Sequence, residues 1–389
     1  MRNQYKSIEV ALLLSMTFVL YNSILLLSTF FIYLSDKISG KYGKLFFVSI
    51  AFLILYLPAA IRFNIGSDYL SYKDIFYTIA SSSAVKYELG FVYLNKIIYF
   101  FGFGYETLVA VSSFIAYAIF FKSYPIKGAW VIHFLFVCSL YLYLYSNIRS
   151  GFVYSIMFLA VIDYILRKNV IRFLALIAVS FSFHKSALIY LMIPLLFVPG
   201  ILYFITKRYV CELLIILLLF LLFNANIVYF FIFSNPLVES LGFSRYMHSS
   251  KWGAETEIGT GLGLIIRIFP VVLYVLLRDK FAQFNSNYKE VTALCLVLLF
   301  AVSCTLALKV GHRVEKLFVF VYFIVLYDFY RARKVLLFRY FLIFMLVFYV
   351  AVFNKSIYDS KLRWVNNWEG YSNIIYPYVT IFNKEDSDR

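Results

Sequence analysis

Long apolar blocks recur along this chain and alternate with short polar segments. Most blocks hold about 16–25 residues, which lets a helix rising about 1.5 Å per residue cross roughly 30 Å of hydrocarbon. The pattern predicts an all-α, polytopic integral membrane protein with about twelve transmembrane helices. We expect these helices at 9–34, 45–61, 106–121, 129–146, 150–166, 171–183, 186–205, 210–233, 261–277, 289–308, 314–330 and 336–353.

One apolar stretch, at 91–103, is too short to cross the membrane and is bounded by Gly90, Gly102 and Gly104. A re-entrant or interfacial helix suits that length better. No internal repeat and no low-complexity linker divides the chain, so we expect a single multi-pass domain over residues 1–389. The first apolar block is too long for a signal peptide and lacks a small-residue cleavage site, so it is the expected first helix.

Basic residues gather in every second inter-helix segment, and these segments are short and contain few acids. The positive-inside rule places such loops in the cytoplasm. Both termini and the remaining segments then lie outside the cell inner (plasma) membrane, on its periplasmic or extracellular face. The outer segments are 62–90, 147–149, 184–185, 234–260, 309–313 and 354–389. They include the two longest internal loops, so we expect the chemistry on this face.

Composition narrows the class of protein further. Only 14% of the residues are charged, against about 25% in soluble proteins. The apolar blocks recur to the end of the chain, which excludes a soluble enzyme with one membrane anchor. The net charge of +16 follows from the basic cytoplasmic loops, so we expect no nucleic-acid partner. The four cysteines lie in apolar blocks without ligand spacing, so we expect no disulfide, no metal site and no cofactor.

The first candidate for chemistry is the outer segment that follows the second helix. Arg62 ends that helix, Gly66 permits a tight turn, and Asp68 follows. Such a turn could return the carboxylate beside the guanidinium, which would place a phosphate-binding arginine next to a base. The alternative is a snorkelling arginine followed by a helix-capping aspartate.

Two short outer turns hold the next candidates. Arg149 lies between the fourth and fifth helices with no acid nearby in the sequence, and a guanidinium held at the membrane boundary needs an anionic partner. Interfacial anchoring is the alternative. His184 lies between the sixth and seventh helices, where it could exchange a proton near neutral pH. The alternative there is an ordinary polar turn.

The remaining candidates come later in the chain. Arg245 lies in the largest loop, and His312 and Arg313 lead into the eleventh helix, where Arg313 could simply pair with Glu315. Together with Arg62 and Arg149, four separate outer segments then supply an arginine. Because the planar guanidinium suits bidentate phosphate binding, such a cluster predicts an anionic lipid headgroup such as a pyrophosphate.

These motifs, taken in order, resemble those of the EpsG/Wzy-like polysaccharide polymerases. The matches run in sequence over nearly the whole chain, and their order is more specific than any one of them. They are Arg62-x-x-x-Gly66-x-Asp68-Tyr69-x-x-Tyr72, Tyr87-Glu88-x-Gly90-Phe91, Asn147-x-Arg149-x-Gly151, His184-Lys185-Ser186-Ala187-Leu188, Ser244-Arg245-Tyr246, Arg313 and Trp368…Tyr376-Pro377-Tyr378. Ser150 stands where many relatives have a glutamine after the arginine.

The resemblance implies a membrane glycosyltransferase of O-antigen, capsule or exopolysaccharide synthesis. Such an enzyme transfers a growing glycan from undecaprenyl pyrophosphate to a new lipid-linked repeat at the outer face. The resemblance implies that Asp68 is the first choice of base and His184 the second. It also implies that Glu88 holds the acceptor sugar or an arginine. The resemblance also implies pyrophosphate ligands at Arg62, Arg149, Arg245 and Arg313, and further substrate contacts at Tyr72 and His312.

The resemblance also indicates the expected partners, and alternative functions remain to be considered. The undecaprenyl-pyrophosphate-linked oligosaccharide and membrane lipid are the expected partners, and a chain-length regulator and a flippase are further candidates. The main alternative function is a lipid-linked oligosaccharide flippase or another polysaccharide exporter, which would carry charges along a central cavity. An O-acetyltransferase and a lipid-linked glycan ligase are further alternatives. Solute transporters usually contain repeats or broken helices, and the sequence shows neither.

Overall fold

The structure, a computed structural model, describes residues 2–81, 87–224, 227, 262–307, 311–365 and 375–382. These residues form helices and no strand, apart from an isolated antiparallel bridge between Arg62 and Thr380. Among them, six helices are long and apolar enough to cross a membrane, and a seventh crossing results if the bent pair Lys185–Leu196 and Pro199–Ile205 is one span. An all-α, multi-pass membrane protein is thus confirmed, and the count of twelve crossings stays a prediction.

The chain forms two compact units. Unit 1 consists of Met1–Tyr190 and Tyr340–Arg389, and unit 2 consists of Leu191–Arg339. Unit 1 contains α1 (Arg2–Lys37), α2 (Lys41–Ile61), α3 (Tyr69–Ser81), α4 (Leu89–Phe100), α5 (Tyr105–Lys122), α6 (Ala129–Phe136), a π-helix (Val137–Tyr141), α7 (Leu142–Leu144), α8 (Ile148–Arg167), α9 (Val170–Phe181) and most of α21 (Leu336–Val365). The expectation of a single domain over 1–389 stays a prediction.

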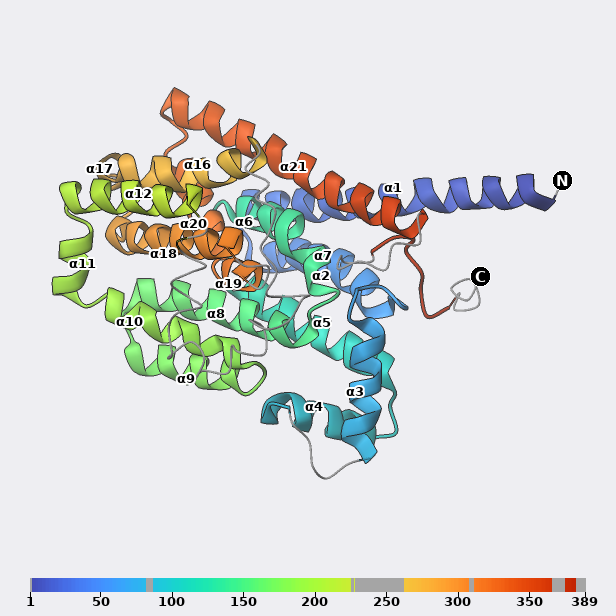
Figure 1. Ribbon diagram of the computed structural model, residues 1–389. Helices are drawn as coiled ribbons and strands as arrows, with labels where there is room; N and C mark the ends of the chain where they lie inside the picture. Colours follow the sequence, from blue (N-terminus) through green and yellow to red (C-terminus); the bar gives the residue numbers. More distant parts are fainter. Residues whose placement is uncertain are drawn as a thin grey trace. The chain divides into compact units, whose positions relative to one another are not determined.

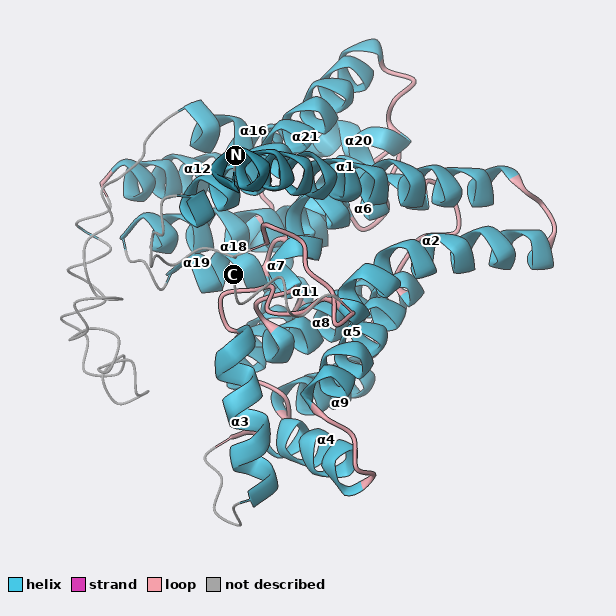
Figure 2. Cartoon of the chain, turned by 90° about the vertical axis from the view of Figure 1, so that its right-hand side faces the viewer, coloured by secondary structure: helices cyan, strands magenta, loops and turns pink. Residues whose placement is uncertain are grey.

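Helix α8 is the inner helix of unit 1. It packs between α5 and α9, while α1 and α2 lie side by side and α2 packs against α5 (Figures 1 and 2). In the apolar 18-residue stretch with which α8 can cross a membrane, 78% of the residues are buried. The corresponding share in α2 is 22%. In the second half of α2 the exposed residues are the apolar Leu53 and Leu57, which suits contact with lipid rather than water.

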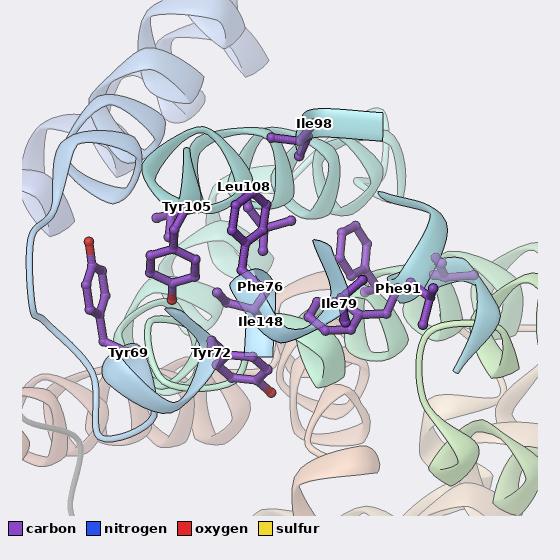
Figure 3. Packing of buried hydrophobic residues seen from close by; sticks show 13 residues of the cluster. Tyr69, Tyr72, Phe76, Ile79, Phe91, Ile98, Tyr105, Leu108 and Ile148 are labelled. Carbon is purple, nitrogen blue, oxygen red and sulfur yellow. The ribbon is translucent and has the colours of Figure 1, made fainter. Parts of the chain in front are cut away.

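The segment predicted as an outer loop at 62–90 contains α3. Its buried residues Tyr69, Tyr72, Phe76 and Ile79 recur at helical spacing and face α4, α5 and α8. Figure 3 shows these side chains together with Tyr105, Leu108 and Phe91 in one cluster. Helix α4 has the short length predicted for the 91–103 stretch. Helices α3 and α4 therefore pack their aromatic side chains against the N-terminal parts of α5 and α8.

The segment predicted as one helix at 186–205 is broken. A 3-10 helix (Lys185–Leu191) leads into α10 (Met192–Leu196), and α11 (Pro199–Ile205) follows after a bend of 87°. Pro199 has no N–H group to continue the preceding helix and restricts the residue before it. The expectation that no crossing is broken is wrong here, because apolar periodicity alone does not register the proline.

Unit 2 is built around α18 (Tyr288–Ala307). The other helices among its described residues are α10, α11, α12 (Arg208–Phe223), α16 (Leu262–Leu276), α17 (Arg278–Phe281), α19 (Gly311–Leu317) and α20 (Phe320–Arg331). Helix α18 packs against α12, α16, α19 and α20. In its apolar 18-residue stretch 72% of the residues are buried. Helix α18 therefore has the same inner position in unit 2 that α8 has in unit 1.

Candidate functional site

The turn after α2 packs directly against the turn before α8. Gly66 has φ +111°, and a Cβ atom there would lie 2.6 Å from the Tyr145 carbonyl oxygen. The Ser67 backbone N–H donates to Ser146 Oγ at 3.0 Å. Only glycine combines this backbone conformation with so close an approach. Two of the sequence motifs therefore meet at this point.

The Arg62 guanidinium is enclosed by this arrangement, and the residue is only 2% exposed. It donates to the Ala59 carbonyl oxygen, to Ser113 Oγ at 3.2 Å and to the Tyr145 carbonyl oxygen at 3.4 Å. It also lies over the Tyr145 ring, 4.6 Å from the centroid. We call Arg62, Ala59, Ser113 and Tyr145 the Arg62 centre. Its acceptors are backbone and hydroxyl oxygens.

The prediction that a turn places the Asp68 carboxylate beside the Arg62 guanidinium is wrong. Within the described residues the two side chains form no ion pair, and Asp68 instead accepts a hydrogen bond from Ser67 Oγ at 3.1 Å. The physical reason is direction, because the guanidinium folds back one turn to Ala59 while Asp68 leads into α3. Burial raises the pKa of nearby Tyr69 to about 12, although the charge of Arg62 opposes this shift.

A C-terminal segment covers the same region. Residues 375–382 run beside the end of α2, and the Tyr376-Pro377-Tyr378 motif lies within them. The hydrogen bonds that hold the segment are Phe63 N to Val379 O at 2.9 Å, Ile381 N to Ile61 O at 2.9 Å, Tyr378 Oη to Pro58 O at 2.8 Å and Tyr21 Oη to Ile375 O at 2.8 Å. The closing motif thus supports the Arg62 centre.

Arg149 occupies a different environment in the first turn of α8. Its Nη1 atom lies 2.9 Å from Glu88 Oε2, and the exposed fractions of the two side chains are 21% and 12%. The guanidinium carbon lies 5.3 Å from the ring centroid of Tyr87, 5.6 Å from Phe91 and 5.8 Å from Tyr72. These five residues are the Arg149 site. The acid that the sequence does not supply locally comes from 61 residues earlier.

Glu88 also joins this site to the turn that carries His184. Its second oxygen, Oε1, accepts from the Lys185 backbone N–H at 3.3 Å. The Gly90 backbone N–H donates to the Ser182 carbonyl oxygen at 2.7 Å, and a Cβ atom at Gly90 would lie 2.8 Å from that oxygen. Of the two roles expected for Glu88, the structure shows the contact with an arginine.

His184 is half-buried, and one of its ring nitrogens is already engaged. The Ser186 backbone N–H donates to Nδ1 at 3.1 Å. A neutral imidazole whose Nδ1 accepts a hydrogen bond carries its proton on Nε2. In this tautomer, inferred from the hydrogen bond, the Nε2 side of the ring is a donor. The geometry therefore favours donation by His184 over action as a base.

Tyr72 connects Asp68 to the Arg149 site. Burial raises the pKa of Tyr72, the charge of Arg149 opposes the shift, and the charge of Asp68 adds to it. The Tyr72 backbone N–H donates to the Asp68 carbonyl oxygen at 2.8 Å, so the two residues are one helical turn apart. In Figure 3 the Tyr72 hydroxyl points away from the neighbouring labelled side chains. Asp68, Tyr72, Glu88, Arg149 and the His184 turn thus belong to one region.

The later candidates lie in unit 2 or outside the described residues. Arg245 and the side chain of His312 are outside them, and Arg313 is exposed on α19. Glu315 forms an ion pair with Arg267 at 3.2 Å. Arg267 lies inside an apolar block, and since intramembrane charges commonly mark functional sites, the sequence carries a signal for this residue too. The convergence of four arginines stays a prediction.

Metal binding has no support in the part of the chain that the structure describes. No group of three or more His, Cys, Asp or Glu side chains there could hold a metal ion. The cationic groups of the region are guanidinium groups. These can bind and orient phosphate oxygens through charge-assisted hydrogen bonds.

Comparison with known proteins gives one match. A family model described as the EpsG family matches residues 44–366, which is most of the chain and includes α3, α4, α8 and the His184 turn. No curated protein and no solved structure matches the chain.

Proposed function

The chain belongs to the EpsG family, which indicates a polysaccharide polymerase of the glycosyltransferase type, and from that premise we propose the reaction and the residues that perform it. The proposed donor is a growing glycan on undecaprenyl pyrophosphate. The acceptor is a new lipid-linked repeat at the outer face of the inner membrane, as in the Wzy type of synthesis. The proposal includes about twelve crossings with both termini outside.

The observation that carries this proposal is the partly exposed ion pair of Arg149 and Glu88, framed by three aromatic rings at the start of a membrane helix. A guanidinium in this position can exchange its carboxylate partner for phosphate oxygens. Aromatic side chains close by provide faces against which a sugar ring can pack. A lipid-linked sugar pyrophosphate presents both groups together.

The proposed step conserves atoms and charge. The acceptor hydroxyl oxygen bonds to the anomeric carbon, whose bond to pyrophosphate breaks, and that electron pair leaves on undecaprenyl pyrophosphate. Asp68 takes the hydroxyl proton, since its carboxylate accepts from the Ser67 hydroxyl and forms no ion pair with a cationic side chain of the described residues. Arg149 stabilises the charge that grows on the leaving group, and His184 Nε2–H donates to the same oxygens.

The other expected residues take secondary places in the proposal. Glu88 holds Arg149 in place before substrate binds, and Tyr72 supports both Arg149 and Asp68. Arg62 acts through the Tyr145–Ser146 turn, because its guanidinium is enclosed. Arg245, Arg313 and His312 remain proposed substrate contacts.

One observation favours the alternative, a flippase or other exporter. The 87° bend between Lys185–Leu196 and Pro199–Ile205 is the kind of interruption that transporters place near their substrate sites. The first member of this pair begins at Lys185, directly after His184. Polymerase and exporter predict different glycan patterns, so one experiment separates them.

That experiment deletes the gene in its host and separates the surface glycan by gel electrophoresis. The strain is complemented with wild type, with Arg149→Ala or with Arg208→Ala, whose side chain is exposed and pairs with Glu212. We expect wild type and Arg208→Ala to restore a ladder, and Arg149→Ala to leave a single repeat at equal protein level. Complete loss of surface glycan on deletion would support export, and an unchanged ladder would contradict the polymerase proposal.

A further inference from the structure

The turn that carries His184 contains a second cation, which the proposed reaction does not yet use. Lys185 follows His184 directly, and its side chain is exposed. In the part of the chain that the structure describes, its ammonium group forms no ion pair. An exposed lysine beside an apolar segment can serve as an ordinary interfacial anchor. The position of Lys185 next to the Arg149 site points to a more specific role.

One carboxylate holds both Arg149 and the backbone of Lys185. Glu88 Oε2 lies 2.9 Å from Arg149 Nη1, and Glu88 Oε1 accepts from the Lys185 backbone N–H at 3.3 Å. The Lys185 backbone is therefore separated from the Arg149 guanidinium by the width of one carboxylate. A lysine side chain is a flexible four-carbon stem that ends in an ammonium group. Lys185 Nζ can therefore reach an anion that is bound to Arg149.

Local hydrogen bonds fix the backbone on either side of Lys185. The Ser186 backbone N–H donates to His184 Nδ1 at 3.1 Å. The Gly90 backbone N–H donates to the Ser182 carbonyl oxygen at 2.7 Å, which attaches the same turn to the start of α4. The Cα atom of Lys185 is thus held in place while its exposed side chain keeps its freedom. Such a side chain can adapt to a ligand without moving the backbone.

Two further polar atoms of this region have no hydrogen-bond partner among the described residues. They are Arg149 Nε and Ser186 Oγ, and both are buried. Buried polar atoms are normally hydrogen-bonded, so unpaired ones beside an accessible ion pair indicate room for a ligand or water to complete them. The Arg149 guanidinium therefore has an N–H group to offer besides the one that faces Glu88.

A pyrophosphate presents two phosphates, and the planar fork of one guanidinium matches the oxygens of one of them. The second phosphate then needs a donor of its own. We propose that Lys185 binds this second phosphate, so that Arg149 and Lys185 together distinguish a lipid-linked pyrophosphate from a lipid-linked monophosphate. The inference rests on the proposed function, which places the first phosphate at Arg149.

The test compares two lipids that share their chain and differ by one phosphate, undecaprenyl pyrophosphate and undecaprenyl phosphate. Their affinities are measured on the full-length protein in detergent. We expect wild type to prefer the pyrophosphate about 10- to 100-fold, the range for a hydrogen bond to a charged group. Lys185→Gln should lose this preference and keep its affinity for the monophosphate, and Lys185→Arg should retain most of it. Equal binding of the two lipids by wild type would overturn the inference.

Lys96→Gln is the matched control, because Lys96 is an exposed lysine of the neighbouring helix α4. We expect it to bind both lipids like wild type. An equal loss in Lys96→Gln and Lys185→Gln would show a general attraction of lysines for anionic lipids and would overturn the inference. A lowered unfolding temperature of Lys185→Gln, with both lipids weakened alike, would show a structural role and have the same consequence.

Arg149→Lys separates this inference from the proposed function. If Arg149 binds the first phosphate, this variant should bind both lipids more weakly. If it does so while Lys185→Gln keeps the wild-type preference, only the role of Lys185 is wrong. If Arg149→Lys binds both lipids like wild type, the proposed pyrophosphate site is wrong, and the inference fails with it.

Discussion

Arg62 and Arg149 both lie beside the ends of membrane helices, yet their surroundings differ. Arg62 is 2% exposed and donates to two carbonyl oxygens and a hydroxyl. The Arg149 side chain is 21% exposed and pairs with a carboxylate between three rings. A buried guanidinium whose acceptors are backbone and hydroxyl oxygens stabilises the folded chain. One whose partner is a replaceable anion can also bind substrate.

The largest expected effect tests the structural half of this comparison. Arg62→Ala leaves three buried oxygens without their donor, and since each unsatisfied group costs about 1–3 kcal/mol, we expect the free energy of unfolding to fall by about 3 kcal/mol or more. Thermal unfolding in detergent measures this change. Arg62→Lys should rescue only part of it, because an ammonium cannot reach three acceptors in the same plane. If Arg62→Ala unfolds like wild type but makes no glycan, the two arginines share a catalytic role.

The next effect tests the binding half. Arg149→Lys keeps the positive charge and a partner for Glu88, but it loses the planar fork that spans two phosphate oxygens. We expect the rate of polymerisation with lipid-linked repeats to fall about 10- to 100-fold, with an unchanged unfolding temperature. A loss of stability equal to that of Arg62→Lys would show that the two centres do not differ.

A smaller effect concerns the turn that joins the two regions. Gly66→Ala places a Cβ atom 2.6 Å from the Tyr145 carbonyl oxygen at φ +111°, and we expect it to cost about 1–3 kcal/mol of stability. Gly102→Ala is the matched control, since Gly102 also has a positive φ but open space around its Cβ position. Equal unfolding temperatures for the two variants would contradict the close approach of the turns.

The smallest effect is a dependence on alkaline pH near the Arg62 centre. The pKa of Tyr69 is about 12 in the folded protein, raised from 10.0 by burial. Below pH 10 both states keep the proton, and above it the unfolded state loses its proton first, so stability falls as pH rises from 10 through 12. Unfolding temperatures across this range should fall less in Tyr69→Phe than in wild type. Parallel curves would contradict the assigned burial.

Much of the architecture was predictable from the sequence. The six helices that meet the criteria for crossing overlap predicted ones, because the apolar length of each segment alone decides its transfer into hydrocarbon. The motif at 87–91 and the turn at 147–151 were both identified as chemical candidates. Their order along the chain was sufficient to indicate the family that the comparison then showed.

Only the tertiary structure decided which of these residues become partners. Arg149 pairs with Glu88 across 61 residues, whereas Asp68, close to Arg62 in sequence, does not pair with it. Packing of α3 and α4 against α5 and α8 sets the first pair, and the direction of the Arg62 side chain prevents the second. Whether a segment enters the membrane depends on its own apolar residues. An ion pair such as Arg149–Glu88 depends instead on how the fold brings two distant segments together.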